Sequence, residues 1–73
     1  MDIQNTFRLN KAVIQLLSVE HSLEQSKIGE REALRKFNDL FDTLIDIRYD
    51  CPDEDVEGYV SKAWGHIERL TMK

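Results

Sequence analysis

Between residues 33 and 47 the apolar side chains recur at the spacing of an amphipathic helix, and this pattern constrains the fold more than any other. At 100° per residue they fall within one arc of about 160°, and the opposite arc is polar or charged. An arc this wide contacts two neighbouring helices rather than one. We predict a helix over about 30–49 that buries Ala33, Leu34, Phe37, Leu40, Phe41, Leu44, Ile45 and Ile47.

A further helix is predicted over about 52–71, where apolar residues again share one face. Pro52 suits the first position of a helix, with Asp50 or Cys51 as the cap before it and acidic residues in the first turn. Trp64 lies at the edge of the apolar face, whose members are Val56, Tyr59, Val60, Ala63, Ile67 and Leu70.

The first stretch of the chain, about 5–27, has two apolar seams instead of one. The first seam follows a strict heptad spacing and consists of Leu9, Ala12, Leu16, Val19 and Leu23. The second is offset by more than about 120° and is interrupted by polar residues. Its apolar members are Ile3, Phe7, Ile14, Leu17 and Ile28. A helix with two seams is either central in its bundle or shared with another chain.

The boundary between the first two helices has two interpretations. Gly29 suits the left-handed residue that ends a helix, after Lys27 in the last turn. One continuous helix over 6–48 would keep the first seam in register, at a cost of about 1 kcal/mol for the glycine. Polar seam positions at Ser26 and Glu30 favour the turn. We predict an all-α fold, a small three-helix bundle forming a single domain over 1–73. The alternative is a long-helix coiled-coil hairpin or dimer.

The stability available to such a chain is small. A single cysteine forms no internal disulfide, and no Cys/His pair has zinc-binding spacing. A core of this size rarely supplies more than roughly 3–5 kcal/mol without a disulfide, a metal or a second chain. We therefore expect stability from good helices, from self-association or from a partner, and we predict a homodimer.

Composition also limits location and partners. No signal peptide is visible, and no apolar run is long enough to span a membrane. We therefore expect a cytoplasmic protein with no membrane partner. The net charge is −4, with the acidity concentrated at 50–57, which argues against binding to phosphate backbones.

No group of residues points to catalysis. Cys51 is surrounded by acids that disfavour its thiolate, so we interpret it as a turn or capping residue. His21 and His66 lack metal-ligand spacing, and we expect both to be half-buried between helices. We predict no enzyme activity, no cofactor and no metal site.

Two surface features are candidates for partner binding. Gly58, Ser61 and Gly65 share a narrow arc opposite the apolar face of the 52–71 helix. Each interior glycine costs about 1 kcal/mol relative to alanine, which suggests close packing against another backbone, with simple exposure as the alternative. The second candidate is an acidic stripe on the 30–49 helix, formed by Asp39, Asp42 and Asp46.

These features favour a small non-enzymatic regulatory or adaptor protein that binds another protein through its helical faces. A specific form of this hypothesis is an acidic decoy inhibitor that occupies a nucleic-acid site on its target. The alternative is a dimeric nucleic-acid-binding regulator. It requires dimerisation to gather on one surface the basic residues Arg8, Lys11, Lys27, Arg31, Arg35 and Lys36.

Overall fold

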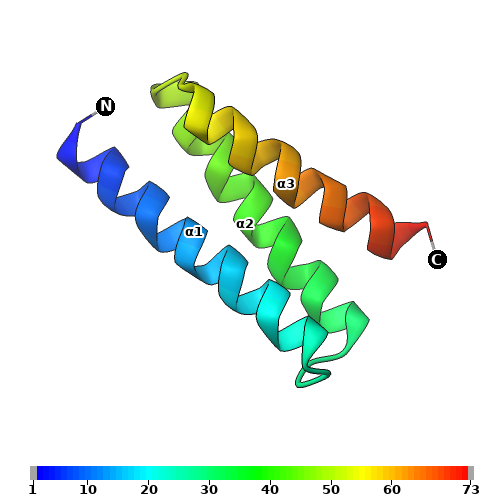
Figure 1. Cartoon of the computed structure of the whole chain (residues 1–73). Coiled ribbons are helices and arrows are strands. Elements are labelled where there is room, and N and C mark those ends of the chain that lie inside the picture. The colour runs from blue at the N-terminus through cyan, green and yellow to red at the C-terminus, as the bar shows by residue number, and fades with distance from the viewer. Residues whose placement is uncertain (1, 73) are drawn as a thin grey trace.

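The computed structural model describes residues 2–72, which form three α-helices joined by short turns. The helices are α1 (Ile3–Glu24), α2 (Glu30–Asp50) and α3 (Glu54–Thr71), and no strand occurs among these residues. Successive helices run in opposite directions, so the chain forms an up-down-up arrangement (Figure 1). The all-α three-helix prediction is confirmed. The single helix over 6–48 is wrong, because the chain turns back between α1 and α2.

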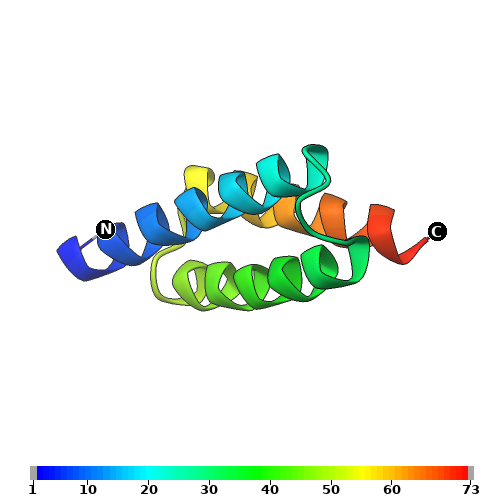
Figure 2. The ribbon, with the colours of Figure 1, turned by 90° about the horizontal axis from the view of Figure 1, so that it is seen from below.

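The central helix is α2, which packs against both α1 and α3. The other two helices lie on the same side of it (Figure 2). Phe37, Leu44 and Ile47 of α2 are fully buried, whereas Phe41 and Ile45 are partly buried at the edge of the core. The wide apolar arc predicted for this helix is therefore the surface that contacts two neighbours.

Of the two seams predicted for the N-terminal helix, one is buried and the other is exposed along the helix. The first seam is buried in the core through Leu9, Ala12, Leu16 and Val19. The second seam is open to solvent along α1, and Ile28, its last member, lies in the turn after the helix and packs partly against the core. The interpretation that this helix is central in the bundle is therefore wrong, because α2 has that position.

The first helix ends earlier than the predicted residue 27, in a Schellman turn. The N–H of Lys27 donates to the carbonyl of Ser22, and the N–H of Ser26 donates to the carbonyl of Leu23. Ser26, with φ of 58°, is the left-handed residue of this turn. Gly29 was the predicted left-handed residue, but it has φ of −80° and is the N-cap of α2. The prediction is wrong because carbonyls at the end of α1 already accept hydrogen bonds from the N–H groups of Ser26 and Lys27, before the chain reaches Gly29.

The third helix begins at Glu54 rather than at residue 52. Asp53 is its N-cap, and the Asp53 carboxylate accepts a hydrogen bond of 2.9 Å from the N–H of Asp55. Pro52 precedes this cap, so its predicted place at the first helical position is wrong. Cys51 is a turn residue, as predicted, but it caps the C-terminal end of α2; the prediction that Asp50 or Cys51 caps the following helix is wrong, because Asp53 has that role.

Polar contacts tie the N-terminus of α1 to the turn between α2 and α3. The Asp2 carboxylate caps α1 by accepting from the N–H of Asn5 at 2.8 Å, so the helix begins before the predicted residue 5. The buried Asn5 amide donates to the Cys51 sulfur at 3.3 Å and accepts from Arg8 at 3.3 Å. Arg8 also lies 3.8 Å from Asp50. Side-chain contacts therefore join the N-terminus of α1 to the turn at the same end of the bundle.

Candidate functional site

The predicted strip of small residues lies on the outer face of α3. Gly58, Ser61 and Gly65 are all exposed. A Cβ added at either glycine would meet no atom within 4 Å. Packing within the chain therefore does not require glycine at these positions. That another backbone packs against the strip stays a prediction.

The predicted acidic stripe lies on the outer face of α2. Asp39, Asp42 and Asp46 are exposed, and none of them forms an ion pair with another described residue of the chain. The stripe and the small-residue strip belong to different helices, so the structure does not join them into one surface. An apolar face lies between them.

This apolar face spans α2 and α3 and encloses a shallow groove of about 470 Å³. The rings of Trp64 and Phe41 meet across it with their centroids 5.4 Å apart and their planes tilted by 37°. Trp64 nevertheless keeps 48% of its surface exposed. We refer to this surface as the Trp64 face and define it by Phe41, Ile45, Val60, Ser61 and Trp64.

The sequence alone does not identify the Trp64 face, although it contains part of the signal. Trp64 lies at the edge of the apolar arc of α3, and Phe41 and Ile45 lie at the edge of the arc of α2. Edge positions of two helices become one face only through the relative rotation of those helices. Arg48 also lines the groove, and its Nε lies 3.0 Å from Oε1 of Glu57, which offsets its charge.

A second apolar surface, the outer seam, runs along the side of α1 that faces away from the core. Its members Ile3, Phe7, Ile14 and Leu17 are exposed by 90%, 68%, 67% and 51% of their surface. Phe7 and Ile14 line a shallow depression together with Asn10. Monomeric proteins rarely expose a contiguous apolar patch of more than a few hundred Å² unless it is used for binding.

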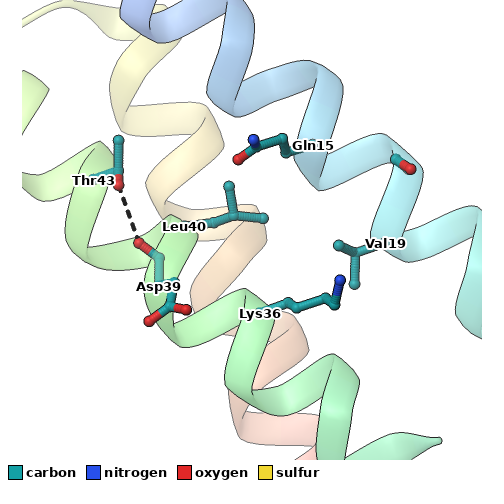
Figure 3. A pocket seen from close by; sticks show the side chains of 7 residues that line it. Gln15, Val19, Lys36, Asp39, Leu40 and Thr43 are labelled. Carbon is teal, nitrogen blue, oxygen red and sulfur yellow. Dashed lines mark hydrogen bonds between the residues drawn. The ribbon is translucent and has the colours of Figure 1, made fainter. Parts of the chain in front are cut away.

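A third depression, of about 300 Å³, lies between α1 and α2 (Figure 3). Lys36 extends across it toward Val19 of α1, while the Asp39 carboxylate points away from α1. The Thr43 hydroxyl donates to the Asp39 carbonyl of its own helix at 3.1 Å. No histidine or thiol lines this depression, and its single lysine and single carboxylate do not converge. It offers no arrangement for acid–base chemistry.

One cluster of titratable side chains bridges α1 and α3. Oε2 of Glu20 lies 2.6 Å from Nε2 of His66, and Oε1 lies 3.5 Å from Nζ of Lys62. The His66 ring stacks on Phe37, with centroids 4.6 Å apart. His66 is thus partly buried between helices, as predicted, whereas His21 is exposed on the outer side of α1, contrary to the prediction. No hydroxyl or thiol group of the described residues forms a hydrogen bond with this cluster. The cluster connects α1 to α3.

The basic residues required by the nucleic-acid alternative are divided among α1, the following turn and α2. Arg8 already lies near a carboxylate, that of Asp50. Lys36 lines the depression between α1 and α2, whereas Arg35 does not, and both are exposed on α2. Nothing in the structure adds support to that alternative.

Three further findings concern metal ligands, membrane-spanning helices and similarity to known proteins. In the part of the chain that the structure describes, no group of His, Cys, Asp and Glu side chains is placed to hold a metal ion. No helix within residues 2–72 has the length and apolar character needed to cross a membrane. Comparison of the chain with protein-family models, with curated proteins and with solved structures gives no significant match.

Proposed function

We propose that this chain is a non-enzymatic regulatory or adaptor protein that binds another protein through the Trp64 face. The observation that carries the proposal is the half-exposed indole of Trp64 beside Phe41 over an apolar groove. Tryptophan is enriched at the energetic centres of protein interfaces, where a covered aromatic ring contributes a large apolar area.

The shape of the Trp64 face suits a helical segment of the partner. Its walls are mainly apolar side chains from two antiparallel helices, α2 and α3 (Figure 1), and Ser61 and Arg48 complete the lining. A partner helix places apolar side chains at i, i+3, i+4 and i+7 into a groove of this kind. Ser61 lines the groove, and Gly58 and Gly65 continue the same strip along α3. These small residues allow the partner backbone to approach α3 closely.

The charges around the Trp64 face favour a basic partner. Asp42 and Asp46 directly follow the two α2 members of the face along the chain, and Glu68 lies one turn beyond Trp64. None of these three carboxylates forms an ion pair within residues 2–72, whereas the charge of Arg48 is offset by its own ion pair. The proposed partner segment is therefore an amphipathic helix whose apolar side is flanked by Lys or Arg. If the chain acts as a decoy inhibitor, this partner segment is part of the nucleic-acid-binding surface of the target.

The proposal is tested by capture followed by direct binding. The tagged chain is used to capture partners from its own cells, and bound protein and bound nucleic acid are identified separately. The captured protein is then purified and titrated against the chain while tryptophan emission is recorded. Trp64 is the only tryptophan of the chain, and a Trp64→Phe variant identifies its share of the signal. We expect the emission of Trp64 to shift to shorter wavelengths as the captured protein is added, and the shift to saturate.

Two variants make the test specific for the Trp64 face. Ser61→Arg introduces bulk and positive charge at an exposed position that lines the groove, so we expect at least about tenfold weaker binding. Gln25→Arg, which introduces the same arginine at the exposed C-cap of α1 and outside both apolar surfaces, is the control and should bind like the wild type. Equal binding by all three proteins would contradict the proposal.

The alternative function gives a different result in the same experiment. Capture of nucleic acid without protein, released by salt, would contradict the proposal and support the dimeric nucleic-acid-binding regulator. The proposal also includes a cytoplasmic location, where the one thiol of the chain, Cys51, stays reduced.

A further inference from the structure

The outer seam of α1 has the spacing of a coiled-coil contact surface. Ile3, Phe7, Asn10, Ile14 and Leu17 are separated alternately by four and three residues. At 100° per residue this seam is centred about 160° from the seam that α1 turns toward the core. Because α2 and α3 both lie on the core side, no other described helix of the chain covers the outer seam.

We propose that a second copy of this chain covers the outer seam, with α1 packed against α1 as a two-helix coiled coil. The proposal does not depend on the Trp64 face. The four apolar side chains of the seam expose on the order of 500 Å² in each copy. A two-fold contact buries about twice that area, which lies in the range of small, reversible protein interfaces.

The outer seam is nearly free of charge, which favours a copy of itself over a charged partner. Among the positions that flank the seam between residues 4 and 18, only Lys11 is charged; the set is Gln4, Thr6, Lys11, Val13 and Ser18. In a parallel, in-register pair each Lys11 faces Thr6 of the second copy, so like charges do not meet. Glu20, the next flanking residue, is already engaged by His66 within its own chain.

Asn10 interrupts the apolar seam at its middle. Its replacement is therefore expected to change the dimer affinity in a defined direction. A primary amide both donates and accepts hydrogen bonds, so two Asn10 side chains that meet in a coiled coil satisfy each other. Such a polar layer fixes the register of the helices but weakens their association relative to leucine. Replacement of Asn10 by leucine should therefore strengthen a dimer built on this seam.

Sedimentation equilibrium of the full chain between about 1 and 500 µM tests the proposal. We expect a reversible monomer–dimer equilibrium with a Kd in the micromolar range. Ile14→Asp should raise this Kd by more than about tenfold, and Asn10→Leu should lower it by about tenfold. Because Ile14 is exposed, circular dichroism of the Ile14→Asp variant should still show a folded helical chain. The control is Tyr49→Asp, a change at an 88% exposed residue outside both apolar surfaces, which should leave the Kd within about twofold.

A chain that remains monomeric over this whole concentration range overturns the proposal. A dimer whose Kd is unchanged by Ile14→Asp, or is raised equally by Tyr49→Asp, overturns it as well. Ser61→Arg, which tests the Trp64 face, is expected to leave the dimer Kd unchanged because Ser61 lies on α3. The two proposals can therefore fail separately.

Discussion

Replacing the two interior glycines of α3 with alanine should stabilise this chain. Gly58 and Gly65 lie inside α3, away from both of its ends. A Cβ at either position would meet no atom within 4 Å, so alanine introduces no clash. The gain is the helix propensity that glycine lacks, which arises largely from the greater freedom of glycine in the unfolded chain.

The expected gain is about 1 kcal/mol for each glycine. The two sites lie two turns apart, or about 10 Å along the helix, so their effects should add to about 2 kcal/mol. For an m-value of about 1 kcal/mol/M, the midpoint of urea unfolding should rise by about 2 M. The melting temperature should rise by about 8–16 °C. Circular dichroism at one fixed chain concentration measures both, because self-association makes the midpoint depend on concentration.

A double variant that is no more stable than the wild type would refute this reasoning. It would mean that α3 is not continuous through Gly58, or that a second backbone already packs against the strip in the isolated protein. A stabilised variant that binds the captured partner more weakly has a different meaning. The glycines would then serve the partner, and their cost to the free chain of about 2 kcal/mol would be explained by function.

Three further substitutions test the core, the outer face of α2 and the first turn. Phe37→Ala should lower the free energy of unfolding by about 3–5 kcal/mol, close to the whole stability of such a chain, because Phe37 is fully buried and stacks on His66. Asp39→Ala, on the outer face of the same helix, should change it by less than about 0.5 kcal/mol, and similar effects in urea unfolding would contradict the assignment of the faces. Ser26→Gly should raise the melting temperature, with a gain of about 1 kcal/mol, because glycine adopts a φ of 58° without steric cost. A lower melting temperature would contradict the Schellman turn.

The helix over 30–49 was the most predictable part of the fold, and the structure has it at Glu30–Asp50. Its apolar residues form one contiguous arc, so burial energy and helical periodicity favour the same rotation of the helix. Phe37, at the centre of this arc, is fully buried, while Phe41 at the edge remains partly exposed. Because many apolar residues favour the same rotation of this helix, the prediction does not depend on any single residue.

The helix ends were less predictable, because the alternatives differ by only about 1 kcal/mol. Gly29 is the better left-handed residue by intrinsic preference, yet the chain uses Ser26. Pro52 is a good first residue for a helix, yet the Asp53 carboxylate one position later supplies the cap. Tertiary packing decides between such choices, since it sets where each turn must lie to bring α1 and α3 onto α2.

The candidate site was predictable only in part, because it combines residues from different helices. The exposure of Gly65 and Asp42 follows from the periodicity of each helix. The contact between Trp64 and Phe41 does not, because it depends on how α3 is rotated against α2. The hydrogen-bond contact between Glu20 and His66 joins residues 46 positions apart, and no local pattern indicates it.

The geometry of a three-helix bundle explains why the two seams of α1 could not both be buried within the chain. In this arrangement α1 packs mainly against α2 and barely against α3, so the surface that α1 buries forms one contiguous arc. The arc of α2 meets this condition and spans about 160°. The seams of α1 are centred about 160° apart, and burying Leu16 on one of them turns Ile14 on the other toward solvent. Among the three described helices, α1 therefore cannot bury both of its seams within the chain, and the outer seam is left for the contact proposed above.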